Sequence, residues 1–191
     1  MMASHFYAML SRMKNIKRWG LMRNTRNENF SEHSLEVAYF AHALAVIRNK
    51  RFGGNIDANF VACAAMFHDT AEIITGDLPT PIKYYNREIR NAYKQIEGIA
   101  DEQLISLLPE DLRDEFRPLY NVDPDIKKII KAADKLSALA KCIEERNMGN
   151  KEFVDAEKST RNAIHKLNLP EAEVFLDEFM ESFSLTLDEQ K

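Results

Sequence analysis

The fold is decided by residues 57–76, which read DANFVACAAMFHDTAEIITG. Asp57 is a good helix cap, and the residues from 60 to 67 are all apolar or small. A helix that is apolar around its whole circumference has to be surrounded by other helices. We therefore predict a central helix from Ala58 to about Thr75, which Gly76 ends.

Three titratable residues, His68, Asp69 and Glu72, interrupt the second half of this apolar stretch. On a helix, His68 and Glu72 would share one face because they are four residues apart, and Asp69 precedes Glu72 by three. Burying such groups is costly unless they are paired. A divalent metal ion is a suitable partner, because imidazole nitrogens and carboxylate oxygens ligate first-row divalent cations.

Elsewhere in the chain, apolar residues recur at three- and four-residue spacing between only six glycines and six prolines. This period predicts an all-α fold with about seven to eight helices. The further helices are expected at 4–16, 31–50 with Ser31 as N-cap, 86–108, 109–119, 124–148, 153–167 and 171–183. Alternating Phe183, Leu185 and Leu187 predict an extended segment at the end.

Length and composition predict one globular domain over 1–191, with 45% hydrophobic and 29% charged residues. Its motif-bearing core spans about 4–149, and C-terminal helices follow at about 151–184. The net charge of −4, without a block of like charges, argues against a nucleic-acid polymer or a membrane as partner. Without a long apolar run or a leader pattern, a cytoplasmic location is expected. Cys63 and Cys142 are expected to be buried free thiols.

His33 and Asp134 are the residues best placed to join His68 and Asp69 around one divalent ion. His33 lies in the first turn of the expected helix 31–50, and Asp134 lies on an apolar face of the expected helix 124–148. Taken singly, each such residue is more often a cap, an ion-pair partner or a satisfied core group. Glu28, Glu32 and Glu36 are expected to line a solvated face or to complement the helix start.

Basic and aromatic residues precede His33 and indicate an anion site. Arg18, Arg23 and Arg26 carry guanidinium groups that suit phosphate oxygens, although Trp19 by itself is more often a packing residue. The run 77–81 predicts a rigid non-helical loop, because each proline disfavours helix in the residue before it. A metal centre, a nearby acid and a basic loop together fit hydrolysis of a small phosphate ester.

The ordered set His33, His68-Asp69 and Asp134 resembles the H…HD…D signature of the HD-domain phosphohydrolases, a helical metal-dependent superfamily. Roughly the first 150 residues resemble the bacterial 5'-deoxynucleotidases. The motifs that carry this resemblance are Arg18-Trp19 and the runs 31–34, 68–72 and 76–81. The resemblance implies an HD-type helical bundle that removes phosphate from deoxyribonucleoside 5'-monophosphates and discriminates against ribonucleotides. It also implies a homodimer with one divalent ion, such as cobalt or manganese.

The same resemblance implies a role for each matching residue. The implied metal ligands are His33, His68, Asp69 and Asp134. Glu72 would position or deprotonate water or assist the leaving oxygen, and Arg18 would orient the phosphate. Asp69 is also implied to be a catalytic residue. The implied substrate contacts are Arg18, Trp19, His33, Asp69, Asp77, Leu78, Pro79, Thr80 and Asp134, of which Trp19 and residues 77–80 would shape the sugar pocket.

Two other hypotheses remain open from the sequence. The same helical metal site could support a triphosphohydrolase, a cyclic phosphodiesterase or an oxygenase, because a ligand set does not fix the substrate. The chain could also be a non-catalytic nucleotide-binding protein whose amphipathic helices dock a partner. The products separate these hypotheses: phosphate alone, pyrophosphate or triphosphate, an oxidised polyol, or no product at all.

Overall fold

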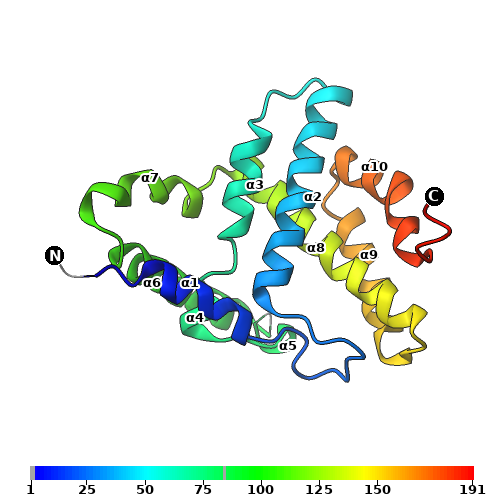
Figure 1. Cartoon of the computed structure of the whole chain (residues 1–191), viewed down its shortest axis with the longest axis horizontal. Helices are drawn as coiled ribbons and strands as arrows, with labels where there is room; N and C mark the ends of the chain where they lie inside the picture. The colour runs from blue at the N-terminus through cyan, green and yellow to red at the C-terminus, as the bar shows by residue number, and fades with distance from the viewer. Residues whose placement is uncertain (1–2, 84) are drawn as a thin grey trace.

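The computed structural model describes residues 3–191 except residue 84 and the side chains of residues 80 and 81 (Figure 1). Within this part of the chain, β pairing is limited to one isolated antiparallel bridge between Lys17 and Asn29, so the all-α class is confirmed. The α-helices are α1 Phe6–Leu10, α2 Phe30–Arg51, α3 Ala58–Met66, α4 Glu72–Thr75, α5 Thr80–Lys83, α6 Arg87–Ser106, α7 Glu110–Tyr120, α8 Pro124–Asn147, α9 Val154–His165 and α10 Pro170–Glu178, and the 3₁₀ segments are η1 Ser11–Asn15, η2 Lys151–Phe153 and η3 Met180–Ser184.

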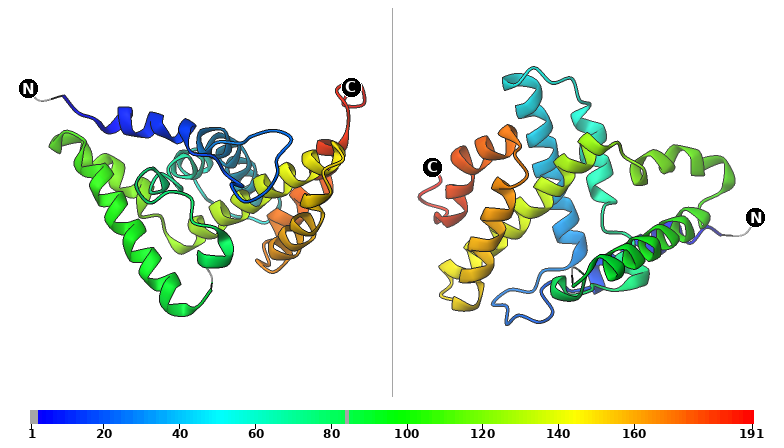
Figure 2. Two further views of the ribbon diagram at one scale, coloured as in Figure 1. Left: turned by 90° about the horizontal axis from the view of Figure 1, so that it is seen from below. Right: turned by 180° about the vertical axis from the view of Figure 1, so that it is seen from behind.

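The core lies where α2, α3 and α8 meet. α2 and α3 run side by side, and α8 crosses behind them, as the views from front and back agree (Figures 1 and 2). Alanines let these helices approach closely, and branched residues fill the remaining space. The buried residues include Val37, Ala41, Leu44, Ala45, Val61, Ala64, Ala65, Ile129, Ala132, Ala133, Leu136 and Leu139.

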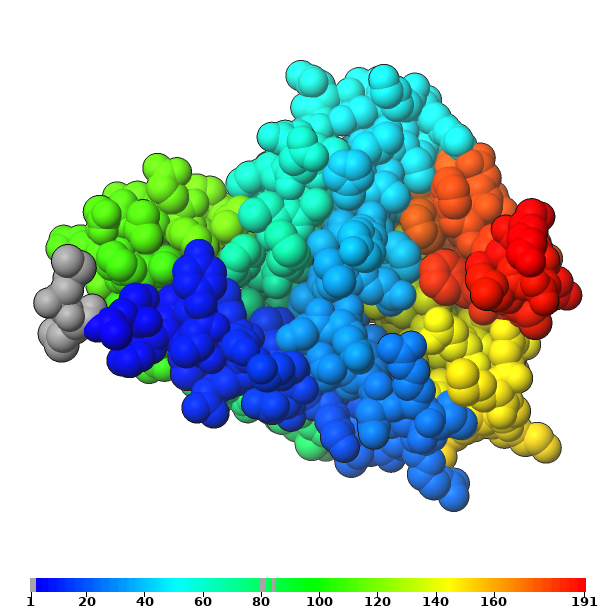
Figure 3. Space-filling model, in the orientation of Figure 1, coloured from blue at the N-terminus to red at the C-terminus, as the bar shows by residue number. Residues whose placement is uncertain are grey.

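A smaller cluster attaches α1, α6 and α7 to this core. Phe6, Leu104 and Leu108 are buried together, and Phe67 packs on them from the end of α3. α6 slants away from α8 (Figure 2), and a cavity of about 390 Å³ is lined by both helices. On the face in Figure 3, the N-terminal segment covers most of the region of α4 to α6.

The N-cap of α2 differs from the prediction. Asn29, not Ser31, caps the helix: its side chain accepts hydrogen bonds from the backbone N–H groups of Ser31 and Glu32. Glu32 in return accepts from the Asn29 N–H, which completes a capping box. This reciprocal pair satisfies two helix-end donors more completely than Ser31 alone could. The cap predicted at Asp57 is confirmed, and Asp123 caps α8 in the same way.

The predicted continuous helix from Ala58 to Thr75 is wrong. α3 ends at Met66, residues 67–71 form tight turns, and α4 begins only at Glu72. The side chains of His68 and Thr70 bond to backbone carbonyls three residues earlier, and the backbone N–H of His68 also bonds to Ala65 O. Such bonds compete with the α-helical ladder. His68 and Asp69 therefore project from a turn.

Two further predictions about loops are corrected. Thr80–Lys83 form α5, so the expected non-helical loop 77–81 extends only to Pro79, because a proline is tolerated in the first turn of a helix. The expected extended end is also wrong, since Phe183 belongs to η3 and Leu187 lies in an exposed turn. In the described residues, no helix is long and apolar enough to cross a membrane.

Candidate active site

Three separate elements bring the four predicted metal-ligating residues together. α2 carries His33, the turn after α3 carries His68 and Asp69, and α8 carries Asp134. His33 Nε2 lies 3.3 Å from Asp134 Oδ1 and 3.6 Å from Asp69 Oδ2, and His68 Nε2 lies 3.1 Å from Asp69 Oδ2. Ligand atoms of His33, His68 and Asp134 all lie within 4.8 Å of one another.

The two histidines each present a buried nitrogen that the rest of the described chain leaves unsatisfied. Nε2 of His33 and Nε2 of His68 have no hydrogen-bond partner there. Their Nδ1 atoms are engaged, at 2.9 Å from Ser137 Oγ and 2.8 Å from Ala65 O respectively. With Nδ1 carrying the proton, each Nε2 lone pair faces the carboxylates, an arrangement that calls for a cation. Two imidazoles and two carboxylates are a suitable donor set for a first-row divalent ion.

The charges of the cluster follow from burial and close pairing. Burial raises the pKa of Asp134, but His33 and Arg18 hold it well below its ordinary value. Burial likewise raises the pKa of Asp69, yet His68 lowers it to about 2. Burial lowers the pKa of His33, whereas Asp69 raises the pKa of His68 against the effect of burial. Both carboxylates are therefore ionised, and a metal ion would compete with a proton at His68.

A serine and a glutamate behind His33 were missed by the sequence analysis. The fully buried Ser137 hydroxyl accepts from His33 Nδ1 and donates to Glu36 Oε2 at 2.6 Å. Glu36 is thus half-buried behind a predicted ligand, and the expectation of a solvated face is corrected. Ser137 follows Asp134 by three positions and Glu36 follows His33 by three, and this spacing is the signal that could have found them.

Glu72 begins α4 and is buried, with 6% of its surface exposed. The Tyr93 hydroxyl donates to both carboxylate oxygens at 3.2 and 3.3 Å, and Lys83 Nζ lies 3.6 Å from Oε1. Burial raises the pKa of Glu72 to about 7, with Lys83 acting in the opposite direction. The cavity between α6 and α8 is lined by Glu72 together with His68, Asp69 and Asp134. An acid that titrates near neutrality therefore faces the same space as the cluster.

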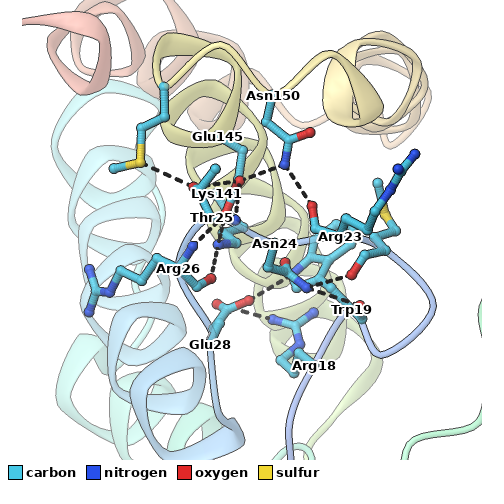
Figure 4. Close-up of polar contacts among 12 residues, drawn as sticks. Arg18, Trp19, Arg23, Asn24, Thr25, Arg26, Glu28, Lys141, Glu145 and Asn150 are labelled. Carbon is cyan, nitrogen blue, oxygen red and sulfur yellow. Dashed lines mark hydrogen bonds and ion pairs between the residues drawn. The ribbon is translucent and has the colours of Figure 1, made fainter.

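The loop before α2 carries Arg18, whose guanidinium lies next to Glu28 in Figure 4. Arg18 Nη2 lies 3.7 Å from Asp134 Oδ1, and the buried Nη1 has no hydrogen-bond partner within the described chain. Trp19 adopts a left-handed backbone conformation, with φ of 59°, and its indole N–H donates to Glu28 Oε2 at 2.7 Å. Glu28 also lies 3.6 Å from Arg18 Nη1, so the expectation of a solvated Glu28 is corrected. The loop thus holds the Arg18 guanidinium between Glu28 and Asp134, beside the cluster.

Buried Glu145 on α8 anchors this loop (Figure 4). Its carboxylate accepts from the backbone N–H groups of Thr25 and Arg26 and from the side chains of Lys141 and Asn150. These bonds, against the opposing effect of burial, hold the pKa of Glu145 well below its ordinary value. The sequence analysis missed this anchor, because nothing in the local pattern links residue 145 to residue 25.

The remaining predicted site residues are divided between the cluster and the surface. Arg23 pairs with Glu152 at 2.8 Å and Arg26 is exposed, so neither joins Arg18 at the cluster. Burial raises the pKa of Asp77 and Arg18 opposes that rise, which places the two side chains within electrostatic reach. Leu78 and Pro79 are half-buried, whereas the side chain of Thr80 lies outside the described residues.

Comparison with known proteins gives consistent matches over nearly the whole chain. Residues 5–183 match the family model described as 5'-deoxynucleotidase YfbR-like. A 5'-deoxynucleotidase of Vibrio cholerae is 52% identical over 192 residues and 99% of each chain, and one of Photobacterium profundum is 51% identical over 97% of each.

Solved structures show the same fold at low identity. An HD-domain phosphohydrolase from Listeria innocua has a TM-score of 0.80 at 23% identity and covers 94% of this chain and 88% of its own. The cyanophage S-2L HD phosphohydrolase, solved with dA and one catalytic Zn²⁺ ion, has a TM-score of 0.66 at 17% identity. The match covers 92% of this chain and 96% of the phage protein. The HD-domain fold is therefore shared with this chain.

Proposed function

The chain belongs to the YfbR-like family of 5'-deoxynucleotidases, and from that membership and the arrangement of the site we infer that it is a metal-dependent phosphomonoesterase. Its reaction is hydrolysis of deoxyribonucleoside 5'-monophosphates to deoxyribonucleosides and phosphate. The observation that carries this proposal is the pair of buried, unpartnered Nε2 atoms facing two ionised carboxylates, next to Arg18 and Glu72.

We propose that the metal ligands are the four residues of the cluster, His33, His68, Asp69 and Asp134. A divalent ion held there would lower the pKa of bound water and offset the charge of the phosphate. Cobalt or manganese is the proposed ion, and this choice rests on the family resemblance. Water and a phosphate oxygen would complete the coordination, because four protein ligands leave positions open on such ions.

Arg18 and Glu72 are proposed to act on the substrate directly. The Arg18 guanidinium, which lies beside Asp134, would bind a phosphate oxygen and orient the ester. The Glu72 carboxylate, with a pKa of about 7, can hold a proton or release it near neutral pH. Glu72 would take a proton from the attacking water as the new bond to phosphorus forms. The bond from phosphorus to the 5'-oxygen breaks, and the leaving oxygen would gain the proton that Glu72 took from the water.

The sugar pocket is proposed to lie between Trp19 and residues 77–80. Trp19 is fixed by Glu28, and Asp77 is close enough to Arg18 for their charges to interact. A substrate whose phosphate is bound by Arg18 would present its sugar to this region. A rigid wall there would crowd a 2'-hydroxyl, which is the proposed basis of selectivity against ribonucleotides, with base tolerance if the contacts end at the sugar.

Two finer properties are also proposed: a homodimeric state, which the resemblance implies, and a cytoplasmic location. Ile96 and Ile99 on α6 are 50% and 60% exposed and form a candidate contact surface between two copies. Sedimentation of the native chain and of a variant with both residues replaced by glutamate tests the dimer. A wild-type monomer at working concentration would contradict it.

The test of the activity is phosphate release from matched dAMP and AMP by metal-stripped protein, with and without cobalt or manganese. The proposal expects metal-dependent release from dAMP, little from AMP, and loss of turnover in Glu72→Ala. The matched control is Glu178→Ala: Glu178 ends α10 and pairs with Arg51 of α2 at the surface, and this variant should keep full activity. Pyrophosphate or triphosphate as product would favour another hydrolase chemistry, and tight binding without turnover would favour a nucleotide-binding protein.

A further inference from the structure

Lys83 contacts Glu72 within the same cavity and has no role in the site described so far. It ends α5, and its side chain is 25% exposed. Its Nζ lies 3.6 Å from Glu72 Oε1 and 2.8 Å from Glu97 Oε1. A lysine bound to two carboxylates in a partly buried position remains charged, and Glu97 and Glu72 raise its pKa against the effect of burial.

α6 holds this ammonium group in place. Glu97 and Tyr93 are four residues apart on that helix and therefore share one face. Glu97 pairs with Lys83, and Lys83 Nζ stands over the Tyr93 ring at 4.5 Å from its centroid. The Tyr93 hydroxyl meanwhile donates to the Glu72 carboxylate. The carboxylate of Glu72 is thus held from one side by an ammonium and a hydroxyl that α6 positions.

The same contact connects the two ends of one segment. Glu72 is the first residue of α4, and Lys83 is the last residue of α5. Their approach holds together the base of the intervening chain, which includes residues 77–79 of the proposed sugar pocket. A simple tie between α5 and α6 would need only the Lys83–Glu97 pair. The additional approach to Glu72 places a positive charge beside the residue that the chemistry uses.

We propose that Lys83 is a positioning residue of the hydrolysis: anchored by Glu97 and Tyr93, it holds the Glu72 carboxylate toward the metal cluster. This inference rests on the proposed phosphomonoesterase function. Lys83 acts through Glu72 and does not ligate the metal. Its loss should therefore lower kcat and leave KM and metal affinity nearly unchanged.

The test measures kcat and KM for dAMP with cobalt-loaded Lys83→Met, together with cobalt affinity of the metal-stripped protein. A loss of kcat of about tenfold to a hundredfold is expected, as for a misplaced catalytic group, with KM and cobalt affinity within about twofold of wild type. Lys83→Arg keeps the charge and should recover part of the rate. Lys158→Met removes an exposed lysine that pairs with Asp155 on α9, and it should leave all three quantities unchanged.

A double variant tests whether Lys83 acts through Glu72. In a Glu72→Gln background, adding Lys83→Met should change the residual rate by less than about twofold, because the partner is already altered. The proposal would be overturned if Lys83→Met lowered the rate by the same factor in the Glu72→Gln background as in wild type. A wild-type kcat in Lys83→Met would overturn it as well. If Lys83→Met does not fold, Glu97→Gln frees Lys83 from α6 and should still lower kcat, by about threefold to tenfold. Wild-type protein without phosphate release from dAMP would instead refute the proposed function, and this inference with it.

Discussion

Replacing Ser137 with alanine should weaken metal binding without touching a metal ligand. Ser137 is fully buried on α8, and its hydroxyl joins His33 Nδ1 to Glu36. The hydrogen bond from Nδ1 keeps the proton on that nitrogen and directs the lone pair of Nε2 toward the carboxylates. Removing the hydroxyl takes away both the orientation of the ring and the partner of a buried donor.

The size of the effect follows from what is left around His33. Glu28 Oε1, another acceptor near this nitrogen, lies 3.7 Å from Nδ1, which is too far for a hydrogen bond. A buried donor without a partner costs about 1 to 3 kcal/mol. Loss of a hydrogen bond behind a metal ligand usually lowers metal affinity by about tenfold to a hundredfold, or about 1.4 to 2.8 kcal/mol. Both estimates predict the same range for Ser137→Ala.

The assay is titration of metal-stripped protein with cobalt, followed by the visible absorption of the bound ion. Ser34→Ala is the matched control, because Ser34 is a buried serine next to His33 whose hydroxyl has no partner in the described part of the chain. That control should bind cobalt as wild type does. A Ser137→Ala affinity within about twofold of wild type would refute the argument that Ser137 orients His33.

Two other predictions follow from buried carboxylates. Glu145→Gln leaves Lys141 buried without its counter-charge, so it should lower the free energy of unfolding by about 3 to 5 kcal/mol, measured by urea denaturation at pH 7. The looser Arg18 loop should also raise KM for dAMP. Unchanged stability, which is the result expected for the control Glu178→Gln, would contradict this prediction. Because the pKa of Glu145 is lowered on folding, its ionised carboxylate stabilises the fold at pH values above the ordinary pKa of a glutamate. That stabilisation is lost as the pH falls below the ordinary pKa. Glu72 has the opposite sign: its folded pKa of about 7 is raised from 4.5, so its ionisation costs stability as the pH rises through that interval. Metal-free Glu72→Gln should therefore exceed wild type by on the order of 1 to 3 kcal/mol at pH 8 and by little at pH 5, and an equal difference at both pH values would contradict the assignment.

Two of the predictions that failed share one physical cause, which is local competition for backbone hydrogen bonds. The apolar period through residues 58–75 identified α3, of which Val61, Ala64 and Ala65 are buried. It could not reveal that His68 and Thr70 would bond to carbonyls three residues earlier and break the ladder. Asn29 displaced Ser31 as cap for a similar reason, because Glu32 completes the reciprocal pair. Periodicity reports which face is buried and does not report how each backbone group is satisfied.

The sequence by itself determined the helical class and the four residues that gather around one point. These depend on composition, on the spacing of apolar side chains and on the resemblance of an ordered motif, all of which are local or sequential properties. The tertiary structure alone decided the partners: Ser137 and Glu36 behind His33, Glu145 beneath the Arg18 loop, and Lys83 beside Glu72. Apart from Glu36, which shares α2 with His33, each partner lies on another element than the residue it contacts, and only the packing of the helices brings such residues within hydrogen-bonding or ion-pairing distance.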